Sequence, residues 1–164
     1  MKRAMMFPGQ GSQSVGMLAA LAAAEPAVAE TFGEASDALG YDLWALCQQG
    51  PEERLSETER TQPAMLSAGI ATWRAWERQG GPRPDMLAGH SLGEYSALVA
   101  SGALDFRATT ALVRFRGEAM QRSTGPLLTP SNTAARNSKY ASSRHTDTTS
   151  DNTARQGLIF QLVH

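Results

Sequence analysis

The sequence predicts an α/β protein in which helices pack on a parallel sheet. Two short apolar runs, residues 3–7 and 86–88, each end in a glycine-rich loop, and helix-forming stretches separate them. Strands that alternate with helices in this way are typical of parallel sheets. Ligands bind such sheets at the carboxyl ends of the strands, which is where both glycine-rich loops are expected. We therefore expect a binding site beside these two loops.

The spacing of apolar residues predicts the helices and their buried faces. Helices are expected over residues 17–24, 27–39, 64–78, 91–101 and 106–122. Asp105 is expected to cap the last of these helices, and Leu112, Val113 and Met120 to face the core from it. Residues 52–60 carry many charges and few apolar side chains, which predicts a surface stretch.

The second apolar run leads into Gly89-His90-Ser91-Leu92-Gly93, the pattern of a nucleophile elbow. In such a turn the serine hydroxyl is exposed between a strand and a helix, and the two glycines are required because the tight turn leaves no room for a Cβ. The helix that follows offers free N–H groups and the positive end of its dipole to a developing oxyanion. The pattern indicates Ser91 as a nucleophile, although similar motifs also occur in ordinary glycine-rich turns.

Three other polar residues have two interpretations from the sequence alone. Gln10 lies between two glycines in the loop 8–13, which either lets the backbone approach a ligand or simply connects a strand to a helix. The loop matches neither a P-loop nor a dinucleotide fingerprint. Gln62, next to Pro63, is either an active-site amide or a polar residue near a helix start. Arg116, considered alone, is either a solvated surface arginine, which is the more common case, or a functional residue.

Composition argues against several classes of protein. A chain of 164 residues is long enough for one compact domain with a core. Its net charge of −1 and its mixed charges provide no basic stripe for nucleic acid and no polybasic segment for a membrane surface. Cys47 is the only cysteine, which excludes an intramolecular disulfide and a cysteine-rich metal site. The apolar stretch 4–7 is too short for a signal peptide or a membrane span, so we expect a cytoplasmic protein.

The composition changes abruptly after Ser123. Residues 129–155 are dominated by Ser, Thr, Asn, Asp and Arg and cannot bury enough apolar surface to offset the entropy of ordering. We therefore expect residues 1–123 to form the folded part and residues 124–164 a polar, disordered tail. Near its end, residues 157–163 form a small apolar run that could dock as an edge strand, although the sequence shows no partner for it.

Three motifs together resemble the malonyl-CoA:acyl carrier protein transacylase family of bacterial type II fatty acid synthesis. They are Met6–Gln13, Thr61–Ala64, and Gly89–Ala97 with Arg116-Gly117 downstream, in the family's order and near its spacing. The resemblance extends from residue 4 to about residue 122. It implies the start of an α/β-hydrolase-like large subdomain, while the family's small ferredoxin-like subdomain is not recognisable in this chain.

The resemblance also implies a role for each candidate residue. Ser91 would take the malonyl group from coenzyme A as an ester and pass it to the phosphopantetheine thiol of acyl carrier protein. The backbone N–H groups of Gln10 and Leu92 would form the oxyanion hole, and Arg116 would bind the malonyl carboxylate. His90 and Gln62 would line the substrate site. The coenzyme A thioester is then a substrate, no separate cofactor or metal is expected, and the partners are malonyl-CoA and acyl carrier protein.

The chain departs from the family's pattern at the general base. The family's catalytic histidine follows the small subdomain, and neither His145 nor His164 has the residues that surround it in the family. The residues after Ser123 resemble an unrelated tail on a truncated or frame-shifted product. The alternative to an active malonyl transferase is therefore a catalytically inactive fragment. A serine esterase would share the Gly-x-Ser-x-Gly motif but would not explain the first glycine-rich loop or Arg116.

Overall fold

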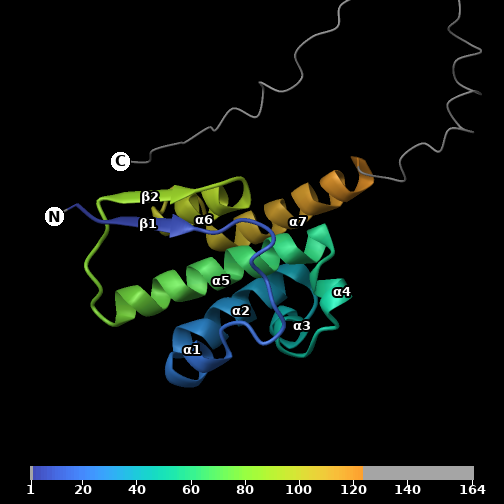
Figure 1. Ribbon diagram of the computed structural model, residues 1–164, viewed down its shortest axis with the longest axis horizontal. Helices are drawn as coiled ribbons and strands as arrows, with labels where there is room; N and C mark the ends of the chain where they lie inside the picture. Colours follow the sequence, from blue (N-terminus) through green and yellow to red (C-terminus); the bar gives the residue numbers. More distant parts are fainter. Residues whose placement is uncertain (1, 124–164) are drawn as a thin grey trace, which may run out of the picture.

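The computed structural model describes residues 2–123. The predicted tail, residues 124–164, and the apolar run 157–163 within it lie outside the described residues. In chain order the elements are β1 (Ala4–Phe7), α1 (Ala19–Ala24), α2 (Pro26–Leu39), α3 (Leu43–Gln49), α4 (Glu52–Leu55), α5 (Thr58–Arg78), β2 (Met86–Gly89), α6 (Leu92–Ala100) and α7 (Phe106–Ser123) (Figure 1).

Strands β1 and β2 form a small parallel sheet, which confirms the predicted α/β class (Figure 1). In their register Ala4 pairs with Met86 and Phe7 with Gly89. Because the strands run in the same direction and end at paired residues, the loop after Phe7 and the turn after Gly89 leave the same edge of the sheet. The sheet thus brings the two glycine-rich segments together, as the sequence predicts.

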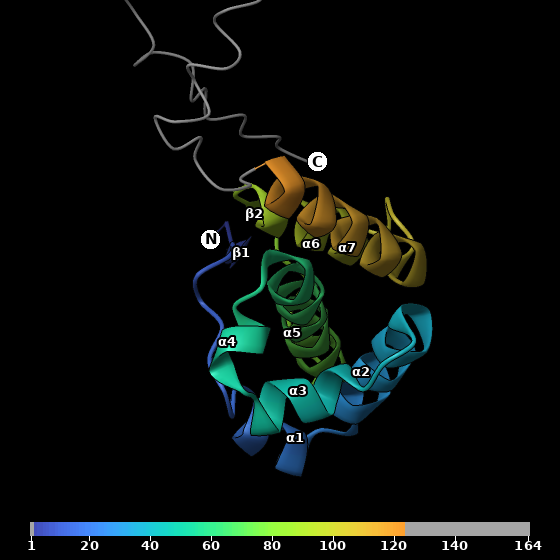
Figure 2. The ribbon, with the colours of Figure 1, turned by 90° about the vertical axis from the view of Figure 1, so that its right-hand side faces the viewer.

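Helix α5 runs through the centre of the described fold. Figure 2 shows it nearly end-on, with α2 and α3 on one side and α6 and α7 on the other. Leu66 and Ile70 are at most 1% exposed, and Trp73 is 5% exposed, which confirms the predicted apolar face. Burial of these side chains contributes about 1.5 to 3 kcal/mol each. The core of the described residues is therefore built around α5.

Two helix starts can be compared with the sequence predictions. Helix α5 begins at Thr58 instead of Ala64, so Pro63 lies inside it. A proline there removes one helical hydrogen bond, but tertiary packing commonly outweighs local propensity, and this first part of α5 packs tightly against α7. The expected cap of α7 is confirmed, because the carboxylate of Asp105 accepts a hydrogen bond from the backbone N–H of Ala108 at 2.8 Å.

Two expectations about burial are wrong. Residues 52–60 are not all surface, because Leu55 is fully buried in the core. On α7, Val113 is fully buried as expected, whereas Leu112 is 46% and Met120 39% exposed. The buried row on α7 repeats every three or four residues, namely Phe106, Thr109, Thr110, Val113 and Gly117. Leu112 does not belong to that row. Met120 continues its spacing but lies in the last turn of α7, where its side chain stays partly exposed.

Cys47 provides a test of whether this core forms in the 164-residue chain. Its side chain on α3 is fully buried, and burial raises the pKa of its thiol to about 12. The thiolate is the reactive form, so at about pH 8 the folded protein should react with a thiol-specific disulfide reagent at least about a hundredfold more slowly than the same protein in urea. Labelling at the same rate with and without urea would show that the core does not form.

Candidate active site

Ser91 occupies a strained turn between β2 and α6. Its backbone has φ 54° and ψ −105°, a conformation that side-chain-bearing residues rarely adopt. A Cβ on Gly89 would lie 2.0 Å from the carbonyl carbon of Gly93, and a Cβ on Gly93 would lie 2.3 Å from the backbone oxygen of Phe7. Both glycines of the motif are therefore required by contact, and the predicted geometry of the elbow is confirmed.

Helix α6 begins immediately after the serine. Leu92 is its first residue and is buried, while the N–H of Gly93 donates to the carbonyl of His90 at 2.9 Å. The first N–H groups of a helix have no acceptor within the helix, and the helix dipole is positive at this end. The backbone next to Ser91 thus lies where a developing negative charge is stabilised.

The first glycine-rich loop lies against the elbow. A Cβ on Gly9 would be 3.2 Å from the carbonyl oxygen of His90, which leaves little space between the two segments. Gln10 is exposed, and its side-chain amide donates to the hydroxyl of Thr58 at 3.3 Å. The loop is therefore held between the elbow and the start of α5.

Arg116 reaches the serine from α7. Its Nη2 donates to the Ser91 hydroxyl at 2.8 Å and its Nη1 donates to the side-chain oxygen of Gln62 at 2.8 Å. Gln62 is fully buried, and its amide nitrogen contacts the Met120 sulfur at 3.2 Å. The Arg116 guanidinium also lies 5.7 Å from the centre of the Tyr95 ring. Arg116 is thus partly buried and bound to the elbow, so the interpretation as a solvated surface arginine is wrong.

Gly117 explains how the arginine and Gln62 meet. A Cβ at this position would lie 2.7 Å from the Cα of Glu59 and 2.7 Å from the carbonyl oxygen of Thr58. The backbones of α7 and α5 therefore approach closely just beside Arg116, and α5 carries Gln62 one turn further on. None of Gly117, Met120 and Tyr95 is assigned a role at the site from the sequence, although Met120 is expected to face the core and the other two lie within the motifs. A glycine inside a helical pattern next to an arginine is the signal that could have found the close approach.

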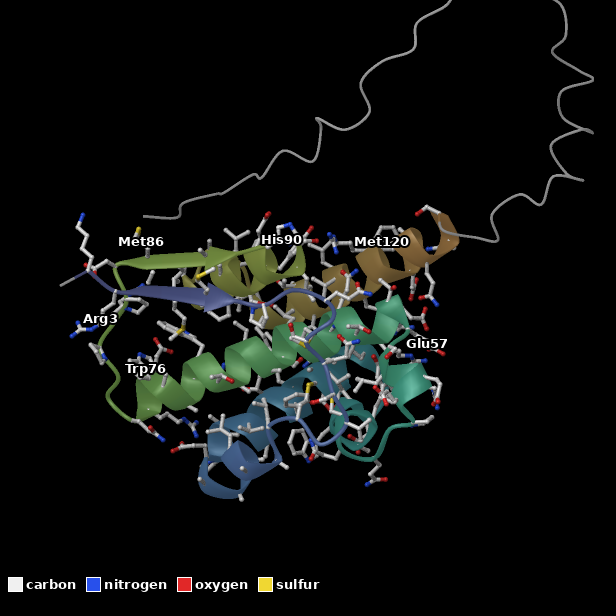
Figure 3. All side chains as sticks on the ribbon, viewed as in Figure 1. Arg3, Glu57, Trp76, Met86, His90 and Met120 are labelled. Carbon is white, nitrogen blue, oxygen red and sulfur yellow. The ribbon has the colours of Figure 1, made fainter. Side chains whose placement is uncertain are left out.

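His90 is brought to the elbow but does not complete a catalytic pair there. It is exposed at the end of β2, and Figure 3 shows it and Met120 toward the same face of the molecule. Among residues 2–123 it is the only histidine. The Ser91 hydroxyl is hydrogen-bonded to Arg116, and a guanidinium cannot accept a proton. His145 and His164 lie outside the described residues.

Residues 2–123 contain neither a membrane-spanning helix nor a metal-binding cluster. No helix in this part of the chain is both long and apolar enough to cross a bilayer. No three His, Cys, Asp or Glu side chains there lie together in a way that could hold a metal ion.

The site thus consists of a strained serine on a strand-to-helix turn and an arginine bound to its hydroxyl. The family model for the acyl transferase domain matches residues 5–152, so the chain belongs to this family.

The curated relatives are more specific. The chain is 63% identical over 118 residues to the malonyl CoA-acyl carrier protein transacylase of Salmonella typhimurium, an alignment that covers 72% of this chain and 38% of that protein. The chain thus spans less than half the length of this relative.

Solved structures of similar proteins share the fold of the described residues. The acyl carrier protein S-malonyltransferase of Vibrio cholerae has a TM-score of 0.74 and 57% identity, over 76% of this chain and 40% of that one. A malonyl-transacylase solved in complex with a type II polyketide acyl-carrier protein has a TM-score of 0.74 and 60% identity, again over 76% and 40% of the two chains.

The helix contact at Gly117 predicts opposite effects for two glycine-to-alanine changes. Gly117→Ala should lower the free energy of unfolding by about 1 to 3 kcal/mol, because its methyl group meets backbone atoms that cannot move alone. The matched control is Gly33→Ala in α2, where no atom lies within 4 Å of the new methyl group. That change should be neutral or stabilise the protein by up to about 1 kcal/mol. Urea unfolding measures both, and equal effects would contradict the close approach.

Proposed function

We propose that this chain carries the acyl-accepting site of a malonyl transferase, which moves a malonyl group from coenzyme A to acyl carrier protein through an ester on Ser91. The observation that carries the proposal is the pair of hydrogen bonds from Arg116 to Ser91 and to Gln62. In a malonyl thioester a single methylene separates the reacting carbonyl from the free carboxylate. A cation in contact with the nucleophile is therefore placed to bind that carboxylate while the serine attacks the carbonyl.

The proposed reaction begins with attack by the Ser91 oxygen on the thioester carbonyl carbon. The carbonyl oxygen becomes an oxyanion, and we assign its stabilisation to the backbone N–H groups of Leu92 and Gln10. Collapse of this intermediate breaks the carbon–sulfur bond and expels the coenzyme A thiolate, which takes up the proton that the Ser91 hydroxyl gives up, and leaves a malonyl ester on Ser91. Attack by the carrier protein's thiol then reverses these steps and frees Ser91.

The remaining site residues act on the substrate or on the arginine. Gln62 is fully buried and its side-chain oxygen accepts a hydrogen bond from Arg116, so we assign it the task of orienting the guanidinium beside the substrate carboxylate. His90 is exposed on the elbow and would line the substrate entrance. No cofactor is assigned, because the thioester itself supplies the activated acyl group.

The subdomain organisation and the domain boundary belong to the same proposal. The described residues would be the first portion of an α/β-hydrolase-like large subdomain, and no segment of this chain is assigned to a ferredoxin-like small subdomain. The domain boundary is proposed at residue 123, where the composition changes. We also predict that the protein is located in the cytoplasm.

A second function, binding of malonyl-CoA without turnover, is favoured by one observation. Within residues 2–123 the Ser91 hydroxyl is paired with a group that cannot take its proton. Loss of the general base costs a serine enzyme several orders of magnitude in rate. A serine esterase is less well supported, because hydrolysis has no use for a guanidinium beside the nucleophile.

Covalent labelling separates the two functions. The 164-residue chain is incubated with radiolabelled malonyl-CoA, quenched in acid, digested and mapped. We expect a slowly formed, alkali-labile label on the peptide that contains Ser91, and no label in Ser91→Ala. A label that survives in Ser91→Ala would overturn the assignment of the nucleophile. Tight binding without any label would identify the inactive form.

The proposed role of Arg116 predicts selective loss of malonyl binding. Arg116→Ala should weaken binding of malonyl-CoA by about 2 to 4 kcal/mol, because the carboxylate loses a charge-assisted partner, and should leave acetyl-CoA binding unchanged. Arg107→Ala, an exposed arginine on the same helix, is the matched control and should change neither. Calorimetric titration with both thioesters gives the answer. Equal losses for the two thioesters would indicate a structural arginine instead.

A further inference from the structure

The guanidinium of Arg116 has no carboxylate partner within residues 2–123. Its side-chain hydrogen bonds go to Ser91 and Gln62, which are both neutral, and none of the ion pairs in this part of the chain includes it. Partial burial removes water from a cation, which is costly unless other groups stabilise the charge. Uncharged groups around Arg116 must therefore provide that stabilisation.

The ring of Tyr95 is one such group. The guanidinium carbon of Arg116 lies over this ring, 5.7 Å from its centre. The face of an aromatic ring carries negative potential and attracts a cation at this range. Tyr95 is half-buried on α6 and packs against the core, so its ring is fixed on the helix that follows Ser91. Helices α5, α6 and α7 pack against one another around the arginine (Figure 2).

Arg116 differs from the other two arginines that lie over aromatic rings within residues 2–123. In both of those contacts the arginine also forms an ion pair: Arg60 lies over Tyr41 and pairs with Glu57, and Arg74 lies over Phe106 and pairs with Glu34. A carboxylate of the protein would neutralise the guanidinium and compete with an anionic ligand. An aromatic ring stabilises the cation and leaves its charge available.

We propose that Tyr95 is a positioning residue of the malonyl site, whose ring holds the Arg116 guanidinium beside Ser91 without neutralising it. This inference rests on the function proposed for Arg116. The ring lies against the face of the planar guanidinium, while the bonds to Ser91 and Gln62 fix its edge. A guanidinium has more N–H groups than these two bonds use, so others remain for a substrate carboxylate. Without the ring, carboxylate binding would also have to offset the entropy of ordering a long side chain.

Two substitutions separate the ring of Tyr95 from its hydroxyl group. Tyr95→Leu should weaken binding of malonyl-CoA to the 164-residue chain by about threefold to thirtyfold, the range of a cation–π contact. Tyr95→Phe keeps the ring and should bind within about twofold of the unaltered chain. Neither variant should change acetyl-CoA binding, because an acetyl group has no carboxylate for Arg116. Calorimetric titration with both thioesters measures these effects.

Tyr41→Leu is the matched control. Tyr41 also packs against the core and lies under an arginine, Arg60, that has no hydrogen bond to Ser91 or Gln62. Its replacement should change the affinity for neither thioester. If Tyr95→Leu weakens malonyl-CoA and acetyl-CoA binding equally, or if Tyr95→Phe loses as much affinity as Tyr95→Leu, the proposal is overturned.

A double-mutant cycle tests whether Tyr95 acts through Arg116. In the Arg116→Ala protein, Tyr95→Leu should leave the remaining affinity for malonyl-CoA unchanged, because the group that the ring holds is absent. A tyrosine that only supports the fold would cause the same loss with and without the arginine. That equal loss would contradict the proposed positioning role.

Failure of the proposed function would give a different result. If Arg116→Ala alone leaves malonyl-CoA binding unchanged, the arginine does not bind the carboxylate. The contact with Tyr95 is then tested without ligand, by nuclear magnetic resonance of the chain with isotope-labelled arginine. The Arg116 side-chain N–H protons should resonate further upfield in Tyr95→Phe than in Tyr95→Leu, because a ring shields protons above its face. Identical Arg116 resonances in the two variants would show that the ring does not hold the guanidinium.

Discussion

The hydrogen bond from Arg116 to the Ser91 hydroxyl is the interaction on which the site depends. The two residues come from different elements and are far apart in the sequence, so several packing constraints must hold at once. The elbow must hold Ser91 at a positive φ, and Gly117 must let α7 contact α5. Each constraint concerns backbone atoms, which is why glycines and not larger residues occupy the positions of close approach.

The charge of the site suits one kind of ligand. Arg116 is partly buried, and its two described side-chain hydrogen bonds go to neutral oxygen atoms, those of Ser91 and Gln62. A guanidinium that is oriented by neutral partners keeps its positive charge available to an anion, and its planar fork binds a carboxylate through two N–H groups. An acyl group without a carboxylate gains nothing from this arrangement. Under the proposed function, the site would therefore favour a thioester that carries a free carboxylate over a simple acyl thioester.

The sequence predicted the parts of the fold and site that depend on local patterns. The strands, the elbow and its glycine requirement follow from short motifs whose geometry is stereotyped. Prediction from the sequence failed where contacts between distant elements determine the structure. Helix α5 begins before Pro63 because α7 packs on its first turns. The local sequence pattern also predicted that Arg116 lies on the surface. Its guanidinium reaches the serine only because α7 packs closely against α5. The contact between the buried Gln62 amide and Met120 has no sequence signal of its own.

A matched pair of ligands tests the role of Arg116 most directly. Malonyl-CoA is compared with the analogue in which the free carboxylate is replaced by a carboxamide, which keeps the shape and removes the charge. If the guanidinium of Arg116 receives the carboxylate, calorimetric titration of the full chain should show malonyl-CoA binding at least about tenfold more tightly, a difference of about 1.4 kcal/mol. Equal affinities for the two thioesters would contradict the account, because the charge that the site presents would then play no part in recognition.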